Sequence, residues 1–224
     1  MARVCVFDVN ETLLDLRALE PHFVRIFGNA AVLHTWFGTM LQQAMISTIT
    51  GAYTDFGKLG GAALAITAER FGVAISDEDR QQIVSGIRTL PPHPEVRESL
   101  EKLRDAGLRL AALTNSTEQV AQAQLTNAGL ADLFEQILSA DMVQRLKPAP
   151  EPYHMAAEKL GVGIADIRLI AAHDWDIAGI MRAGGAGAFV ARPGMILSPL
   201  TPTPDVIGAD MRKVVEQIIA IEVQ

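Results

Sequence analysis

Near the start of the chain, the sequence reads Val4-Cys5-Val6-Phe7-Asp8-Val9-Asn10-Glu11-Thr12. Four apolar residues followed directly by a carboxylate are typical of a strand that is buried in a parallel sheet. Ligands of open parallel sheets bind beyond the carboxyl ends of the strands. Asp8 therefore stands where a functional side chain is expected, although a lone aspartate there is equally compatible with a turn or a helix cap.

Further apolar runs repeat this arrangement along the chain. Residues 108–113, 168–172 and 187–191 are predicted strands, and 136–139 is a weaker candidate. Helical patterns lie between them, over 94–106, 118–128 and 152–160, and each is followed by a glycine, which is a common helix stop. This alternation predicts an α/β fold with a Rossmann-like parallel sheet and right-handed crossovers.

The segment after the first strand departs from the alternation. It contains amphipathic helical patterns over 18–27, 32–49, 58–72 and 77–88, and it returns through the stiff linker Pro91-Pro92-His93-Pro94. We predict a catalytic core of residues 1–14 and 92–224, and a helical cap domain of residues 15–91 inserted after the first strand. The active site is expected between the two.

The composition narrows the class of function. The chain has 224 residues, of which 49% are hydrophobic, and 26 Asp+Glu against 19 Lys+Arg give a formal net charge of −7. Such an acidic protein has no general attraction for nucleic acid or anionic membrane. No apolar run reaches the roughly 18 residues of a membrane span, no signal-peptide pattern is recognisable, and the single cysteine, Cys5, lies in an apolar strand. We expect a cytoplasmic protein that acts on a small molecule.

Polar side chains gather at four predicted strand ends. They are Asp8, Asn10 and Thr12; Thr114, Asn115 and Ser116; Lys147; and Asp174 and Asp176. A carboxylate at such a place suits a nucleophile, and a lysine keeps it ionised. A second carboxylate can position or deprotonate water. Each group alone is explained by capping or a turn, but their coincidence favours catalysis.

These motifs resemble those of the haloacid dehalogenase superfamily. The first motif is residues 7–15, the second 113–116, the third 147–153 and the fourth 171–176. The helical insertion matches the superfamily's cap domain, and the likeness covers nearly the whole chain. Most members are Mg²⁺-dependent phosphatases with a second aspartate, a general acid, two residues after the nucleophile. Asn10 stands there, and an amide cannot donate and recover a proton.

Within the superfamily, the chain looks most like the L-2-haloacid dehalogenases. These enzymes also lack the second aspartate, and they share Lys147, Tyr153 and the pair Trp175-Asp176. A halide leaves as a stable anion, so the missing proton donor is no handicap. The resemblance implies a hydrolytic dehalogenase of short (S)-2-haloacids without cofactor or metal ligands, and a homodimer.

The resemblance also implies roles for individual residues. Asp8 is the expected nucleophile, Lys147 keeps it ionised, and Asp176 positions the water that attacks the resulting ester. The expected substrate-binding residues are Thr12, Asn10, Thr114, Asn115, Ser116, Phe37, Tyr153, His173 and Trp175.

The chain departs from the dehalogenase pattern in the residues that grip the substrate. Ala171 and His173 replace the usual serine and asparagine of the fourth motif, and Glu11 replaces a glycine. Phe37, directly after Trp36, stands at the position of the cap arginine. His34, His173 or Arg192 is a candidate substitute for that arginine, whereas Trp36 more simply belongs to the core of the cap. Two alternative functions follow, a Mg²⁺-dependent phosphatase of small esters and a non-catalytic relative that binds a small anion.

Overall fold

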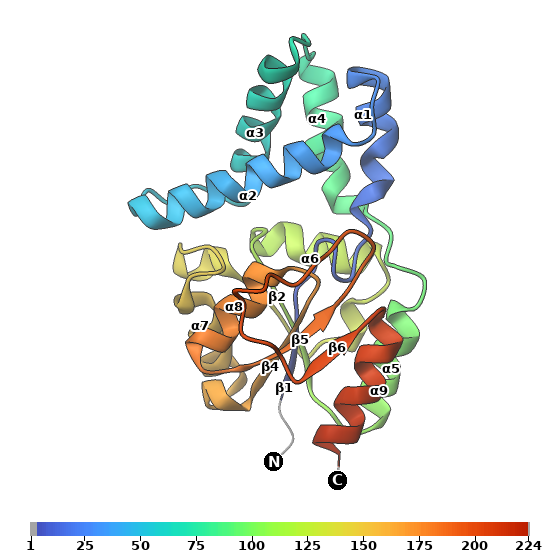
Figure 1. The fold of residues 1–224 in the computed structure, drawn as a ribbon, viewed down its shortest axis with the longest axis vertical. Coiled ribbons are helices and arrows are strands. Elements are labelled where there is room, and N and C mark those ends of the chain that lie inside the picture. Colours follow the sequence, from blue (N-terminus) through green and yellow to red (C-terminus); the bar gives the residue numbers. More distant parts are fainter. Residues whose placement is uncertain (1–3, 224) are drawn as a thin grey trace.

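The computed structural model describes residues 4–223, so the outermost residues of the predicted core lie outside the described part. Six strands form one parallel sheet in the order β3-β2-β1-β4-β5-β6 (Figure 1). Their bounds are β1 Val4–Phe7, β2 Leu110–Thr114, β3 Gln136–Ser139, β4 Ile167–Ala171, β5 Ala186–Val190 and β6 Val206–Gly208. The parallel sheet with its connecting helices confirms the predicted α/β fold.

Strand β1 lies at the centre of the sheet and determines where the polar strand ends meet. Phe7 pairs with Ala112 of β2 and with Ile170 of β4, and the Asp8 amide donates to the Ile170 carbonyl at 3.0 Å. The three strands therefore end at nearly the same level. This register brings Asp8, the residues after β2 and the residues after β4 to one edge.

Successive residues of β1 face opposite layers of helices, as the twofold period of a strand requires. Cys5 and Phe7 pack in one hydrophobic cluster with side chains of helices α5 (Val96–Asp105), α6 (Glu118–Asn127) and α9 (Met211–Glu222). Val4 and Val6 pack in a second cluster with side chains of α7 (Pro150–Leu160) and α8 (Asp174–Ala183). The sheet is thus buried on both faces.

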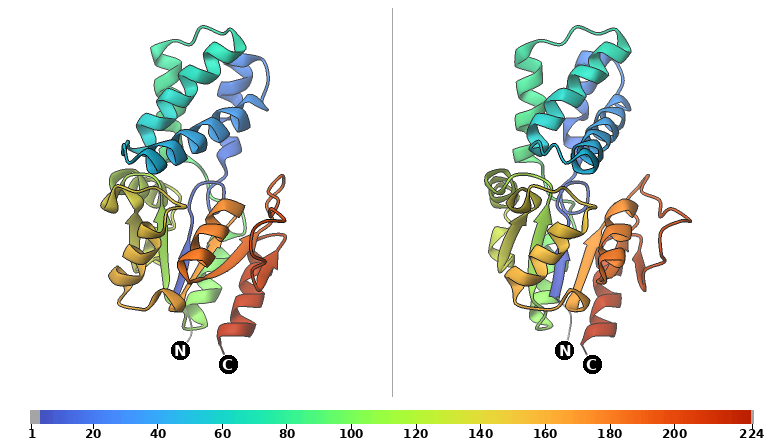
Figure 2. Two further views of the ribbon diagram at one scale, coloured as in Figure 1. Left: turned by 60° about the vertical axis from the view of Figure 1, so that its left-hand side comes forward. Right: turned by 90° about the vertical axis from the view of Figure 1, so that its left-hand side faces the viewer.

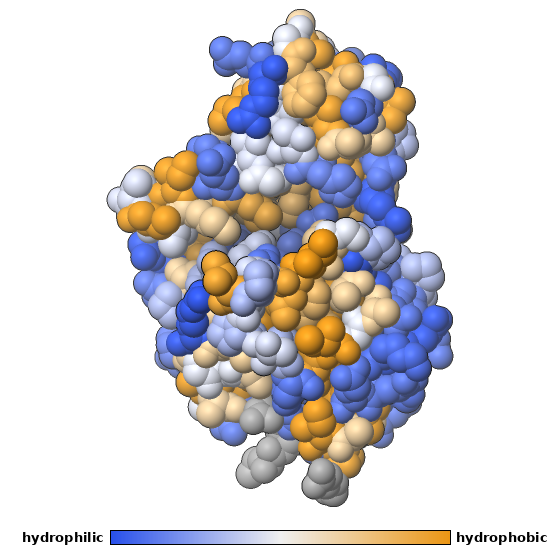
Figure 3. All heavy atoms as spheres, viewed as in Figure 1, coloured by the Kyte–Doolittle hydropathy of each residue, from blue (hydrophilic) through white to orange (hydrophobic). Residues whose placement is uncertain are grey.

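The helical insertion (residues 15–91) stands beyond the carboxyl edge of the sheet (Figures 1 and 2). It contains α1 (Glu20–Phe27), α2 (Val32–Thr50), α3 (Phe56–Phe71) and α4 (Asp77–Gly86), with short 3-10 helices η1 (Leu16–Leu19) and η2 (Ile87–Thr89). Its two connections lie side by side, because the Asp15 amide donates to the Pro91 carbonyl at 2.8 Å and the His93 amide to the Leu13 carbonyl at 2.9 Å. Figure 3 shows the insertion as the upper part of the surface and the core as the lower part.

Apart from the 3-10 helices, three elements of the structure, β6, α8 and α9, are absent from the sequence prediction, which recognised the other five strands. Strand β6 is three residues long, too short to show a pattern. A Cβ added to Gly208 would lie 2.7 Å from the Val214 backbone nitrogen, so glycine is required where α9 passes the sheet. The remaining connections contain 3-10 helices η3 (Ala131–Leu133), η4 (Ala140–Val143) and η5 (Ile164–Asp166). Within residues 4–223, no helix has the length and hydropathy to cross a membrane.

Trp36 of α2 belongs to the interior of the insertion. Its ring is fully buried against Phe23, with ring centroids 5.4 Å apart, and its indole N–H donates to the Gly60 carbonyl at 2.9 Å. Trp36→Phe removes this hydrogen bond and part of a fully buried ring, and we expect the free energy of unfolding to fall by about 1–3 kcal/mol. Urea unfolding checks this prediction, and an unchanged midpoint would contradict it.

Candidate active site

Asp8 is the meeting point of three hydrogen-bond donors. Its side chain is almost fully buried; Lys147 Nζ lies 3.0 Å from Oδ1, and Thr12 Oγ1 and His173 Nδ1 lie 2.7 and 3.1 Å from Oδ2. Burial by itself raises the pKa of Asp8. The Lys147 charge and the His173 and Thr12 bonds outweigh it and hold that pKa well below the ordinary value of 3.8. Asp8 is therefore an ionised carboxylate at neutral pH.

Lys147 uses all of its N–H groups inside the protein. Besides Asp8, its Nζ donates to Asp176 Oδ2 at 2.6 Å and to the Leu113 carbonyl at 2.8 Å. Burial lowers the pKa of Lys147, but the two carboxylates more than compensate and raise it. Asn115 fixes the backbone of this lysine, because its Oδ1 accepts from the Lys147 amide at 2.8 Å and its Nδ2 donates to the Lys147 carbonyl at 3.2 Å.

Asp176 lies in the first turn of α8, where the helix dipole favours a carboxylate. Its Oδ1 accepts from the Tyr153 hydroxyl at 2.5 Å, and its Oδ2 accepts from Lys147. The side chain is fully buried, and this burial raises the pKa of Asp176. Asp176 is therefore held between Tyr153 and Lys147.

His173, the residue before α8, bridges two carboxylates. Its Nδ1 faces Asp8, and its Nε2 lies 2.9 Å from Glu11 Oε2. The ring is stacked between Phe37, at a centroid distance of 6.2 Å, and Trp175, at 5.0 Å. Burial lowers the pKa of His173, but its bonds to the two carboxylates raise it to about 10. His173 is therefore an imidazolium whose two N–H groups are both engaged.

The raised pKa of His173 makes the stability of the protein depend on pH. The imidazolium contributes fully below the unfolded-state value near 6.5, and this contribution is lost as pH rises through the folded value of about 10. We expect His173→Gln to destabilise the protein at about pH 6 by more than at about pH 10. Urea unfolding of both proteins at the two pH values tests this, and a difference that is independent of pH would contradict it.

A small cleft opens onto Asp8 between the core and the insertion. The cleft is narrow, with a free volume of about 10 Å³, and its walls are Asp8, Asn10, Phe37, Leu41, Phe56, Thr114, Asn115, His173 and Trp175. Phe37, Leu41 and Phe56 come from the insertion and form an apolar wall. Within the cleft, the Asn10 side chain is fixed, because Oδ1 accepts from Gln124 Nε2 at 2.8 Å and Nδ2 donates to Ser116 Oγ at 3.4 Å.

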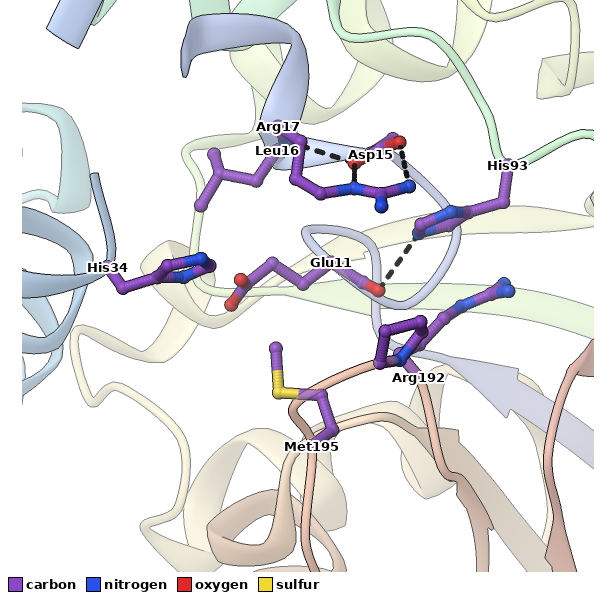
Figure 4. A pocket seen from close by; sticks show the side chains of 9 residues that line it. Glu11, Asp15, Leu16, Arg17, His34, His93, Arg192 and Met195 are labelled. Atoms are coloured by element: carbon purple, nitrogen blue, oxygen red, sulfur yellow. Dashed lines mark hydrogen bonds and ion pairs between the residues drawn. The ribbon is translucent and has the colours of Figure 1, made fainter. Parts of the chain in front are cut away.

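Several predicted site residues thus line the cleft, and others lie around it. Thr12 and Ser116 contact residues of the cleft wall, whereas Tyr153 touches Asp176. His34 and Arg192, two candidate substitutes for the cap arginine, line a separate pocket of about 40 Å³ near the two connections of the insertion (Figure 4). The Arg192 guanidinium is paired with Glu95 and donates to the Thr12 carbonyl at 2.9 Å.

The sequence did not identify four residues of this region as functional: Leu41, Phe56, Gln124 and Glu11. Leu41 and Phe56 reach the cleft, and Gln124 reaches Asn10, only through the packing of helices. Glu11 is marked only in the structure, where its backbone has a φ of 61°, a left-handed conformation that is uncommon outside glycine. Within residues 4–223, no group of three or more His, Cys, Asp or Glu side chains is placed to hold a metal ion.

Comparison with known proteins places this site in a family. Residues 2–184 match the haloacid dehalogenase-like hydrolase family. The chain is 31% identical to (S)-2-haloacid dehalogenase 1 of Pseudomonas sp. strain CBS-3 over 84% of this chain and 81% of that protein. It is 28% identical to the (S)-2-haloacid dehalogenase of Pseudomonas sp. strain YL, over 94% and 91%.

The fold agrees with solved structures. An L-2-haloacid dehalogenase from Xanthobacter autotrophicus, solved with chloropropionic acid covalently bound, superposes with a TM-score of 0.91 at 24% identity, covering 99% of this chain and 100% of the other. The superfamily membership predicted from the four motifs is confirmed by the family match and the curated relatives. This chain belongs to the haloacid dehalogenase-like hydrolases.

Proposed function

We propose that this protein hydrolyses the carbon–halogen bond of short (S)-2-haloacids, with Asp8 as the nucleophile. The observation that supports this most is the state of Asp8, an ionised carboxylate at the floor of a small, partly apolar cleft. An apolar wall excludes bulk water, so the carboxylate is poorly hydrated and reacts more readily with carbon. The curated relatives named above are (S)-2-haloacid dehalogenases, which agrees with this chemistry.

The reaction proceeds in two steps. Asp8 attacks the halogen-bearing C2 from the side opposite the halogen, the halide leaves, and an ester to Asp8 forms. Water then attacks the carbonyl carbon of this ester and releases a 2-hydroxy acid of inverted configuration. Asp176, which Lys147 joins to Asp8, positions the attacking water in this proposal. The raised pKa of Asp176 makes it a better proton acceptor than an exposed aspartate.

The substrate groups have separate partners in this proposal. The indole N–H of Trp175 is buried and has no hydrogen-bond partner within residues 4–223, so it offers a donor to the departing halide. Thr114 and Asn115 line the cleft with Asp8 and, together with the adjacent Ser116, receive the substrate carboxylate in this proposal. We further propose that the insertion acts as the cap that closes this cleft, since Phe37, Leu41 and Phe56 form one of its walls.

Asn10 distinguishes this reaction from phosphate-ester hydrolysis. A phosphatase of this fold needs a proton donor for the leaving oxygen, and an amide supplies none. The Asn10 side chain is also held by Gln124 and Ser116, and its Oδ1 accepts a hydrogen bond there. A halide needs no proton, so the arrangement is sufficient for dehalogenation.

A paired assay tests the proposed function. Purified protein is given (S)-2-chloropropionate or chloroacetate without added metal, and separately a generic phosphate ester with Mg²⁺. We expect halide release in the first assay and no phosphate release in the second. Phosphate release that requires Mg²⁺, without halide release, would overturn the proposal. Absence of both activities would favour a relative that only binds a small anion.

A further inference from the structure

We propose that His173 and Thr12 form an oxyanion site for Oδ2 of Asp8, and that Glu11 is the positioning residue that keeps His173 a hydrogen-bond donor. This inference rests on the proposed function, because it concerns hydrolysis of the ester on Asp8. It gives a role to Glu11 and His173, two of the residues in which the chain departs from the dehalogenase pattern.

The two oxygens of Asp8 have different surroundings. Oδ1 accepts from Lys147 alone, whereas Oδ2 accepts from both the Thr12 hydroxyl and His173 Nδ1. Two donors reduce the nucleophilicity of Oδ2, so Oδ1 is the oxygen that attacks C2. After this attack Oδ1 is the ester oxygen, and Oδ2 is the carbonyl oxygen on which negative charge develops when water adds.

The donors on Oδ2 are held in place before the reaction. The Ala172 amide donates to Thr12 Oγ1 at 2.9 Å, which occupies a lone pair of that oxygen and leaves the hydroxyl proton for Asp8. His173 is fixed by stacking between Phe37 and Trp175. Donors that need no rearrangement in a water-poor site are the arrangement that stabilises an oxyanion most effectively.

Glu11 explains how His173 stays protonated during the second step. Esterification removes the negative charge of Asp8, which is one of the two carboxylate charges that keep the His173 imidazolium protonated. The Glu11 carboxylate on Nε2 remains as counter-charge. The residue is held at both ends, because the side chain reaches His173 and the backbone carbonyl accepts from His93 Nε2 at 3.2 Å (Figure 4).

The backbone of Glu11 supports a functional role. Glu11 has a φ of 61°, in the left-handed region where a residue with a side chain is strained and a glycine is not. Charged groups surround the pair of Glu11 and His173. Asp8 and Glu11 contact His173 directly, and Lys147 Nζ lies 6.0 Å from the centroid of the Trp175 ring. The separate pocket that Glu11 lines also contains the titratable side chains of Asp15, Arg17, His34, His93 and Arg192.

Atoms and charges balance in this scheme. Oδ1 forms the bond to C2, and the carbon–halogen electron pair leaves with the halide. The water oxygen then bonds to Cγ, and an electron pair of the carbonyl moves onto Oδ2. When this pair returns, the Cγ–Oδ1 bond breaks and the product keeps Oδ1 as its hydroxyl oxygen. One proton of the water ends on that hydroxyl and the other is released to solvent, while His173 keeps its own.

Rapid-quench kinetics with (S)-2-chloropropionate tests the inference on His173→Gln and Glu11→Gln, with His154→Gln on the exposed face of α7 as the matched control. We expect His173→Gln to release halide in a burst of one equivalent per site and to accumulate the Asp8 ester, whose hydrolysis is about 10²–10³-fold slower. The burst itself shows that the variant is folded. The control keeps wild-type kinetics.

The pH dependence of ester hydrolysis identifies the role of Glu11. In the wild type, hydrolysis falls as pH rises and His173 loses its proton. In Glu11→Gln this fall moves to lower pH, while hydrolysis at low pH stays near wild type. A rate that rises with pH would make His173 a general base and would overturn the inference. Ester hydrolysis at the wild-type rate in His173→Gln would also overturn the inference. The same holds if the halide burst of His173→Gln falls by the same factor as its steady-state turnover. Absence of halide release from the wild type would overturn the proposed function as well.

Discussion

Lys147→Met is expected to lower the free energy of unfolding by about 3–5 kcal/mol and to abolish turnover. The lysine ammonium is fully buried between Asp8 and Asp176, and methionine fills its volume without its charge. Two carboxylates then face each other in a buried space without their shared cation. Since removing one partner of a buried ion pair leaves uncompensated charge, the loss is larger than for an exposed lysine.

Lys147→Met should also change the pH at which Asp8 becomes protonated. Burial raises the pKa of Asp8, and the Lys147 charge is the largest influence that lowers it. Without Lys147, we expect any residual halide release to fall off at higher pH than in the wild type, because Asp8 is protonated sooner as pH falls. Urea unfolding and halide release are measured against Lys159→Met, an exposed lysine of α7. Equal stability of the two variants would contradict the role of Lys147.

Asp8→Asn is expected to reduce halide release by a factor of about 10⁴ or more. An amide oxygen is a far weaker nucleophile than a carboxylate, and no other carboxylate lines the cleft. The matched control is Asp105→Asn at the exposed end of α5, which should keep full activity. Halide release from Asp8→Asn at a tenth of the wild-type rate or more would show that another group attacks the substrate. Near-UV circular dichroism of both variants separates loss of chemistry from loss of fold.

The sheet was predictable because its strands are continuous apolar runs that end in polar residues. The strands over 136–139 and near 110, 168 and 187 were recognised within one or two residues. The helices of the insertion were recognised too, since each has an amphipathic repeat and a capping or glycine boundary. The division into a core and a cap remains a proposal. The homodimer and the cytoplasmic location are proposals too, because the contacts within one chain establish none of the three.

The candidate site was predictable where residues follow strands, and not where packing brings them in. Asp8 and Asn115 directly follow strands, as predicted, whereas Lys147 lies beyond η4 and not at the end of β3 itself. In the structure, Lys147 contacts both Asp8 and Asn115. Phe56 and Gln124 are brought to the cleft by helices that are distant in sequence. The bridging of Asp8 and Glu11 by His173 depends on a backbone conformation at Glu11 that no side-chain pattern indicates.

The central claim is that Asp8 itself is esterified and then hydrolysed. A single turnover with enzyme in excess over (S)-2-chloropropionate in oxygen-18 water tests it most directly, followed by mass spectrometry of the peptide that contains Asp8 and of the hydroxy acid. The account predicts that the heavy oxygen enters the Asp8 carboxylate, whereas the 2-hydroxypropionate carries an ordinary oxygen. Heavy oxygen in the 2-hydroxypropionate and none in Asp8 would mean that water attacks the substrate directly, and would contradict the account.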